Sequence, residues 1–216
     1  MKKIGFLGDS ITEGAGASDP SHVFSTVCCR LLGAEEYNYG LSGSRMARQR
    51  VADRACDPDE DYLLRARWMP KDLDFVFIFG GTNDFGHGDA ELGQLGDKTP
   101  WTFYGAVYCL CQFFLENRGY SKDQLAFILP TPRIDQDSDN GDGQKDNRHK
   151  WPHLSAYIKA IQEVVPLFGI DAIELQGFEK PLTRPSALTI DGLHPNDKGH
   201  QMIGEQLAAY LKKKGF

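Results

Sequence analysis

The sequence lacks any apolar stretch approaching the ~20 residues that a membrane-spanning helix requires. Its N-terminus passes from Met1-Lys2-Lys3 into an apolar run that ends at residue 7, and this run is too short for the hydrophobic part of a signal peptide. The sequence therefore predicts no membrane span and no secretory leader, and we expect a cytoplasmic protein.

Cysteine and positive charge are also in short supply. The five cysteines are odd in number and form no C-x-x-C pair, so neither a zinc cluster nor a disulfide framework is expected. Cys28 and Cys29 fall in a helical pattern and are expected to be buried free thiols. The net charge is −6, and the arginine-rich segment 45–67 is interleaved with acidic residues, which predicts a solvated surface. A nucleic-acid partner is therefore not expected.

The signatures of several enzyme classes are missing. There is no Gly-x-Ser-x-Gly elbow, no phosphate-binding loop, no Gly-x-Gly-x-x-Gly fingerprint and no His-Glu-x-x-His helix. Asp135, Asp137 and Asp139 alternate as at the start of a calcium loop, but the required glycine comes one position late, at Gly141, and Asp146 replaces the usual glutamate. The sequence thus predicts no cofactor and no metal.

What the sequence does contain is a series of strand-length apolar runs separated by helical patterns. The runs cover residues 4–7, 37–39, 75–79, 125–129 and 170–175, and the helical patterns cover 21–32, 101–117, 154–168 and 196–213. Nearly continuous apolar runs are typical of parallel strands covered by helices on both faces. We therefore predict one domain, residues 1–216, built as a three-layer α/β/α sandwich on a five-stranded parallel sheet. The polar segment at about 134–150 is predicted to be a surface insertion.

Small and polar residues follow four of these runs, where each strand is expected to end. Ligands of such sheets bind beyond the carboxyl ends of the strands, so these segments are predicted to meet at one site. The segments are Gly8-Asp9-Ser10, Gly40-Leu41-Ser42-Gly43-Ser44, Gly80-Gly81-Thr82-Asn83-Asp84 and Pro130-Thr131-Pro132-Arg133.

Ser10 is open to two interpretations. With Glu13 three residues later it fits a capping box, in which the two side chains satisfy backbone N–H groups at the start of a helix. Alternatively it is a nucleophile, which requires a base to accept its proton. Gly14 and Gly16 limit any helix here to about one turn, so a cap would stabilise little structure.

Asp191 and His194 are the best candidates for that base and its partner. The turn between them lets the carboxylate accept from one ring nitrogen and leaves the other nitrogen as a base. Pro195 suits the first helical position, which would place His194 at the N-cap, where the helix dipole disfavours a charged ring. A turn in which Asp191 only organises the backbone and His194 only packs fits the spacing equally well. His87 could line the same site, although a solvated loop histidine is the commoner case.

Acyl transfer also needs hydrogen-bond donors for the oxyanion of the tetrahedral intermediate. Gly43 can offer its backbone N–H because no Cβ obstructs a substrate, and Asn83 can offer its side-chain amide. Either residue alone would be ordinary in a turn. Together with Ser10, Asp191 and His194 they complete the set that an esterase requires.

The order of these segments resembles that of the SGNH, or GDSL-type, hydrolase superfamily. Four ordered blocks spread over nearly the whole chain are far more specific than any one block. Ile11 stands where the leucine of the GDSL name is found, and an apolar residue of equal size should preserve the packing. The matching blocks are Gly8-Asp9-Ser10, Gly43 in its loop, Gly81-Thr82-Asn83-Asp84 and Asp191-x-x-His194-Pro195.

The resemblance implies a flavodoxin-like sandwich and a serine esterase. It implies that Ser10 is the nucleophile, His194 the base and Asp191 the residue that orients the base. It further implies an oxyanion hole made by the N–H groups of Ser10 and Gly43 and by the side chain of Asn83.

Asp9, Trp101 and Arg133 are candidates for contacting the substrate. Trp101, Phe103 and Tyr104 begin a predicted helix, and these rings could face a sugar or acyl chain or could pack in the core. With the polar insertion they favour a small-molecule ester with a short acyl chain, such as a carbohydrate O-acetyl ester. The alternatives are an acyltransferase, a lysophospholipase or thioesterase using the same site, and a catalytically silent carbohydrate-binding module.

Overall fold

The computed structural model describes residues 1–50, 60–143, 145 and 150–216. In these residues five strands form one parallel sheet in the order β2-β1-β3-β4-β5, which confirms the predicted sheet. This is the order of flavodoxin-like sheets, with the switch point between β1 and β3. The strands are β1 (Lys3–Gly8), β2 (Glu35–Gly40), β3 (Phe75–Phe79), β4 (Leu125–Ile128) and β5 (Asp171–Ile173).

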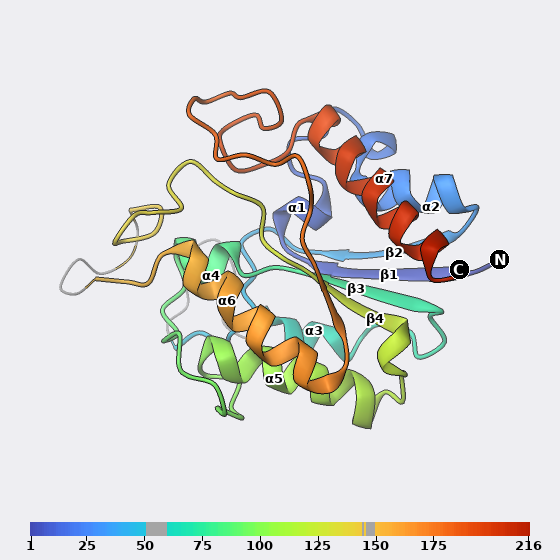
Figure 1. Ribbon diagram of the computed structural model, residues 1–216, viewed down its shortest axis with the longest axis horizontal. Helices are drawn as coiled ribbons and strands as arrows, with labels where there is room; N and C mark the ends of the chain where they lie inside the picture. The colour runs from blue at the N-terminus through green and yellow to red at the C-terminus, as the bar shows by residue number, and fades with distance from the viewer. Residues whose placement is uncertain (51–59, 144, 146–149) are drawn as a thin grey trace.

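Helices cover both faces of the sheet, so the three-layer architecture is also confirmed (Figure 1). α2 (Phe24–Leu32) and α7 (Asp197–Lys213) pack against each other on one face. The other face is covered by α3 (Tyr62–Ala66), α5 (Phe103–Gln112) and α6 (Leu154–Val164).

The central strand β3 shows why both faces need helices. Phe75, Phe77 and Phe79 pack in the core formed with α2 and α7, whereas Val76 and Ile78 pack in the core formed with α5 and α6. None of these five side chains is more than 3% exposed. A strand that is buried on both faces must be apolar at every residue, and all five residues of β3 are apolar.

Two short helices begin directly after strands, on the side where the site is expected. α1 (Ser10–Glu13) is the single turn that Gly14 was expected to end, whereas α4 (Thr82–Gly86) was not predicted. Phe103 and Tyr104, at the start of α5, pack in the core. The remaining short elements border the longer helices and β4: η1 (Pro20–His22), the π-helical turn η3 (Phe113–Asn117), η4 (Lys122–Gln124) and η5 (Val165–Phe168).

The segment predicted to be a polar surface insertion is partly buried, so that prediction is wrong for the residues that pack on α4. Gly141 is buried against Gly86, whose carbonyl oxygen would lie 1.9 Å from a Cβ at position 141. Lys145 is 5% exposed, and its Nζ donates to Asp84 O at 2.7 Å and to Tyr157 Oη at 3.2 Å. These contacts hold part of the segment against the body of the protein.

The alternating aspartates of this segment each pair with a different cation. Within the described residues no group of three His, Cys, Asp or Glu side chains is placed to hold a metal, and Asp146 lies outside those residues. The partners are Arg133 for Asp135, Lys180 for Asp137, and Lys150 with His153 for Asp139.

Burial decides two of the smaller predictions. Cys28 and Cys29 are buried free thiols, as predicted, and burial raises the pKa of Cys28 to about 12. Arg45 is only 3% exposed, so a solvated surface is the wrong description for that arginine. Cys56 and the rest of segment 51–59 lie outside the described residues. Among the helices that are described, none is both long and apolar enough to cross a membrane.

Candidate active site

Ser10, His194 and Asp191 form a hydrogen-bonded chain at the carboxyl ends of the strands. Ser10 Oγ lies 3.0 Å from His194 Nε2, and His194 Nδ1 lies 2.6 Å from Asp191 Oδ2. Because an ionised carboxylate can only accept, Nδ1 carries the hydrogen and Nε2 presents its lone pair to the Ser10 hydroxyl. The structure thus brings Ser10 within reach for proton transfer of His194, which lies 184 residues further along the chain and only three residues after Asp191.

The backbone of its own turn also fixes the Asp191 carboxylate. Asp191 Oδ1 accepts the N–H groups of Leu193 at 2.9 Å and His194 at 2.8 Å. Partial burial raises the pKa of Asp191, but the hydrogen bonds from the His194 ring and from these two N–H groups outweigh it and leave the pKa below 3.8. The carboxylate is therefore ionised at neutral pH.

His194 is not the N-cap of α7, so that prediction is wrong. Asn196 holds the N-cap position, and its Oδ1 accepts the Gly199 N–H at 3.1 Å. Pro195 precedes the helix, and the carbonyl oxygen of His194 accepts the Ile190 N–H at 2.9 Å. The dipole of α7 therefore acts on His194 less directly than the position of Pro195 suggested.

Ser10 is the first residue of α1, and the residue that caps this turn is Asp9. Asp9 Oδ1 accepts the Ile11 N–H at 3.0 Å. The Glu13 carboxylate does not return to the start of the turn, because it accepts the backbone N–H of Ser42 at 2.8 Å and the Ser42 hydroxyl as well. The capping-box interpretation of Ser10 is thus wrong, and its hydroxyl is left to face the imidazole.

Asp9 lies beneath the site, and its carboxyl is 2% exposed. Burial raises its pKa to about 6, although the Ile11 N–H and the charges of His194 and Arg65 act in the opposite direction. The structure thus places this candidate for substrate contact under the turn that carries Ser10, where it acts as a helix cap.

The substitution Asp9→Asn tests the cost of this buried carboxyl. The pKa of about 6 exceeds the ordinary 3.8, so the folded state holds a proton that the unfolded state releases, and stability falls as pH rises from about 4 to 6. Asparagine keeps an oxygen for the Ile11 N–H without the charge. Relative to wild type, the variant should gain ~2 to 3 kcal/mol in free energy of unfolding between pH 4 and pH 8. Urea unfolding at both pH values measures this, and an equal difference at both would contradict it.

The loop after β2 carries Gly43 and lies against α4, which carries Asn83. Gly43 adopts a φ of +75°, a conformation that favours glycine. Asn83 is 4% exposed, and its Nδ2 donates to Ser44 O at 3.0 Å, which leaves a second hydrogen for another acceptor. The N–H of Ser10, in the first turn of α1, has no partner within that helix. The three donor candidates therefore belong to adjoining segments.

Close packing sets the distance between this loop and α1. A Cβ at Gly40 would lie 2.0 Å from the backbone nitrogen of Glu13, so only glycine allows the end of β2 to approach α1 this closely. Two residues later, Ser42 is held by the Glu13 carboxylate. The turn that carries Ser10 and the loop that carries Gly43 are thus joined directly.

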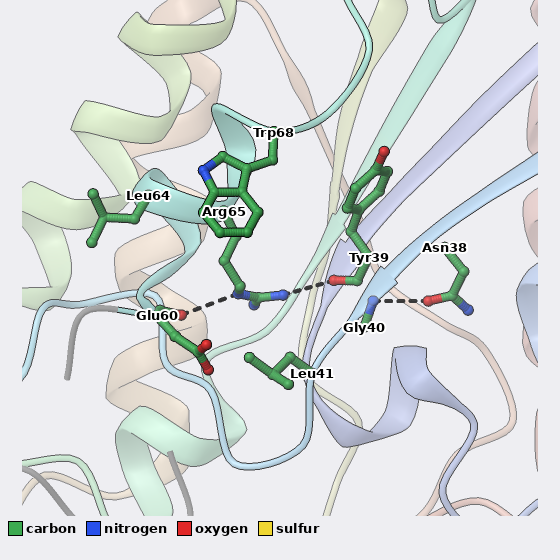
Figure 2. A pocket seen from close by; sticks show the side chains of 8 residues that line it. All are labelled: Asn38, Tyr39, Gly40, Leu41, Glu60, Leu64, Arg65 and Trp68. Carbon is green, nitrogen blue, oxygen red and sulfur yellow. Dashed lines mark hydrogen bonds between the residues drawn. The ribbon is translucent and has the colours of Figure 1, made fainter. Parts of the chain in front are cut away.

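Arg65 supports the same loop from the α3 side, and sequence reasoning missed it. Its guanidinium donates to Tyr39 O at 2.7 Å, to Ser44 Oγ at 2.8 Å and to Gly8 O at 2.9 Å. Arg65 also lines a cavity of about 290 Å³ between β2 and α3. Figure 2 shows it there together with the indole of Trp68, which is exposed. No sequence signal singles out Arg65, because its acceptors in the loop and in β1 are distant in the chain and most of its acceptors are backbone oxygens.

Two further candidates for substrate contact are held by protein partners. Arg133 is 3% exposed and donates to the Asp135 carboxylate at 2.5 and 3.0 Å and to Thr82 O at 3.0 Å. Trp101 is 42% exposed, and the guanidinium carbon of Arg48 lies 5.4 Å from the centre of its ring. The Trp101 ring therefore has one open face, whereas most of the Arg133 donors are already engaged.

A second cavity, of about 220 Å³, is lined by Asp191 and Leu193, which belong to the turn that precedes His194. Most of the side chains that line it are charged, so this space is suited to a polar group. The other lining residues are Arg133, Ile134, Asp135, Asp142 and Arg184.

Comparison with known proteins places this chain in a family. Residues 6–202 match the model of the GDSL-like lipase/acylhydrolase family. A search of curated proteins gave no match. A protein of known structure from Lactobacillus plantarum is 26% identical, with a TM-score of 0.78, and the match covers 98% of this chain and 97% of that one.

More distant solved structures share the fold. A lipase/acylhydrolase from Enterococcus faecalis is 21% identical, with a TM-score of 0.66 over 99% of this chain and 97% of that one. A carbohydrate acetylesterase from Sinorhizobium meliloti is 16% identical, with a TM-score of 0.67 over 99% of both chains. Since the family model spans nearly the whole chain, the protein belongs to the GDSL-like lipase/acylhydrolase family and is an ester hydrolase.

Proposed function

We propose that the chain hydrolyses carboxylic esters through an acyl-enzyme formed on Ser10. The observation that carries the proposal is the chain of hydrogen-bonding contacts from Ser10 Oγ to His194 Nε2 (3.0 Å) and from His194 Nδ1 to Asp191 Oδ2 (2.6 Å). His194 accepts the hydroxyl proton as Ser10 Oγ bonds to the ester carbonyl carbon, and Asp191 orients the ring and stabilises the imidazolium. The proton then passes from His194 to the departing alkoxide as the ester C–O bond breaks.

In the second half of the reaction, water is the nucleophile and Ser10 is the leaving group. Water attacks the carbonyl carbon of the acyl-enzyme while His194 takes a proton from it. The bond from carbon to Ser10 Oγ breaks, the proton returns to Ser10, and the carboxylic acid leaves. One base therefore serves both steps.

We assign stabilisation of the tetrahedral intermediates to the N–H groups of Ser10 and Gly43 and to the Asn83 side chain. Donors aimed at a developing oxyanion contribute ~3 to 4 kcal/mol each to lowering the barrier. The Asn83 Nδ2 contact with Ser44 O, at 3.0 Å, supports this assignment because it fixes the amide beside the Gly43 loop.

For the substrate we propose a short-chain ester of a polar alcohol, with carbohydrate O-acetyl esters as the leading class. The charged lining of the cavity beside Asp191 supports a polar alcohol group, and Arg184 offers it a cationic contact. The exposed ring of Trp101 is a further candidate contact. The fold shared with a carbohydrate acetylesterase is compatible with this class.

A panel of substrates tests this choice. The purified protein is assayed on p-nitrophenyl esters from acetyl to octanoyl and on acetylated xylose and glucose, with Ser10→Ala as the background. We expect kcat/KM to fall at least ~10-fold from acetyl to octanoyl, because the short-chain site that we propose would exclude the longer acyl chain.

Release of acetate from the acetylated sugars is the second expected result of this panel. A preference for octanoyl over acetyl esters would contradict the short-chain proposal and favour a lipid or thioester substrate. Transfer of acetyl to added glycerol, faster than hydrolysis, would favour an acyltransferase.

A further inference from the structure

We propose that His87, held by Asp142, is a positioning residue for the oxyanion hole; this inference rests on the proposed function of the site. His87 directly follows α4, and its backbone N–H donates to Asn83 O at 3.0 Å. Its side chain extends to the loop after β2, where Nε2 lies 3.4 Å from Gly43 O. His87 therefore contacts both Asn83 and Gly43, the two proposed oxyanion donors that do not belong to α1.

Asp142 orients the His87 ring from the opposite side. Asp142 Oδ2 lies 3.2 Å from His87 Nδ1, and the two side chains are only 22% and 12% exposed. The position of the carboxylate is set by backbone packing, because the Asp142 N–H donates to Gly86 O at 3.0 Å and Gly141 packs against the same carbonyl. The segment after β4 thus reaches the oxyanion loop through one aspartate and one histidine.

The chemistry of the partners fixes what the ring must do. Gly43 O and the Asp142 carboxylate are both acceptors, so a hydrogen on Nε2 is required for the first contact and a hydrogen on Nδ1 for the second. A ring that donates only to Asp142 would turn a lone pair toward Gly43 O. The hydrogen bond that holds the Gly43 carbonyl therefore requires a hydrogen on His87 Nε2.

A hydrogen bond to the Gly43 carbonyl matters because glycine is the most flexible residue. The Gly43 N–H must point at one position, that of the oxyanion. The preceding residue, Ser42, is tied to Glu13, and the Gly43 carbonyl is the next group along the chain that can be held. An error of ~1 Å in the position of a catalytic group costs ~100-fold in rate. A 3.4 Å contact in the free enzyme can shorten when the intermediate forms.

Two substitutions of His87 distinguish the roles of its two ring nitrogens. In His87→Gln the side-chain amide nitrogen occupies the place of Nε2 and keeps a donor for Gly43 O. In His87→Asn the amide nitrogen occupies the place of Nδ1 and faces Asp142 alone. Asp142→Asn keeps His87 but removes the carboxylate that orients it.

The control is His153→Gln. His153 Nε2 lies 3.2 Å from Asp139 Oδ1, so this substitution disturbs another histidine–aspartate pair of the same segment. Neither member of that pair belongs to the proposed catalytic machinery, and the control variant should keep the activity of the wild type.

The measurement is kcat and KM on p-nitrophenyl acetate, with thermal unfolding to verify the fold of each variant. We expect His87→Asn to lower kcat ~10- to 100-fold with KM within about twofold, and His87→Gln to recover most of the loss. Asp142→Asn should lower kcat by less than His87→Asn. If His87 served only the stability of the fold, its substitutions would lower the unfolding temperature, and kcat would not differ between His87→Asn and His87→Gln.

The outcomes distinguish this inference from the function on which it rests. If Ser10→Ala is inactive and His87→Asn matches the wild type, the positioning role is wrong and the esterase proposal stands. Equal losses in His87→Asn, His87→Gln and His153→Gln also overturn the positioning role. If His87→Asn does not fold, an unchanged kcat in Asp142→Asn overturns it instead. Activity retained in Ser10→Ala would overturn the function itself.

Discussion

Ser10→Ala should lower kcat for ester hydrolysis by ~10⁴-fold or more and leave the fold unchanged. Alanine has no atom that can attack the ester, so only binding and the oxyanion donors remain to accelerate reaction by water. The contact of Ser10 Oγ with His194 Nε2 is the side-chain interaction that the substitution removes. Initial rates on p-nitrophenyl acetate and the unfolding temperature test both parts of this expectation.

Ser21→Ala is the matched control for this substitution. The Ser21 hydroxyl donates to Asp19 at an exposed site, so its loss also removes one hydrogen bond but touches no catalytic candidate. Ser21→Ala should retain the rate of the wild type. If Ser10→Ala kept more than about a tenth of that rate, Ser10 would not be the nucleophile.

Asp191→Asn should lower kcat by ~100- to 1000-fold with KM within about threefold. The asparagine oxygen can still accept the N–H groups of Leu193 and His194, which turns the amide NH₂ toward His194 Nδ1. Nδ1 must then accept, so the hydrogen moves to Nε2 and the ring can no longer take the Ser10 proton. Loss of a deeply buried triad carboxylate costs ~10⁴-fold, and water reaching the 46%-exposed side chain of Asp191 should reduce that effect.

The control for this substitution is Asp137→Asn, which removes an exposed carboxylate paired with Lys180 at 2.5 Å. Its kcat should match that of the wild type. An unchanged kcat in Asp191→Asn would remove Asp191 from the triad, and a rise in KM alone would make it a binding residue.

Most of the sheet could be predicted because burial on both faces leaves a strong signal. The run at β3 matches the observed strand residue for residue, since no polar side chain interrupts it. β2 gave a weaker signal because it is an edge strand, and polar residues such as Glu35 and Asn38 fit its partly exposed surface. The turn α4 escaped notice because its five residues are too few to show helical periodicity.

The site candidates could be predicted because their residue types are specific to a chemistry, whereas their supports could not. Ser10, His194 and Asp191 belong to a recognisable set, and the hydrogen-bonded chain between them joins the two ends of the sequence. Arg65 and Asp142 act on backbone groups or through another side chain, and contacts of that kind leave no local pattern. Their roles depend on how segments distant in sequence pack together.

The identity of the N-cap before Ser10 shows the limit of local rules. Both Asp9 and Ser10 are good caps by residue type, and Glu13 made the capping box with Ser10 attractive. In the structure Asp9 is the N-cap. The serine hydroxyl contacts His194 instead, and the Glu13 carboxylate binds the loop that carries Gly43. Tertiary partners outweighed the local preference at both positions.

Covalent labelling with an organophosphate asks whether Ser10 is the nucleophile. The protein is incubated with an organophosphate such as diethyl p-nitrophenyl phosphate, digested, and its peptides are weighed by mass spectrometry while residual activity is followed. We expect one phosphoryl group per chain, located on Ser10, with activity lost in parallel and with labelling much slower in His194→Gln. A label on another residue, or full activity after Ser10 is modified, would contradict this expectation.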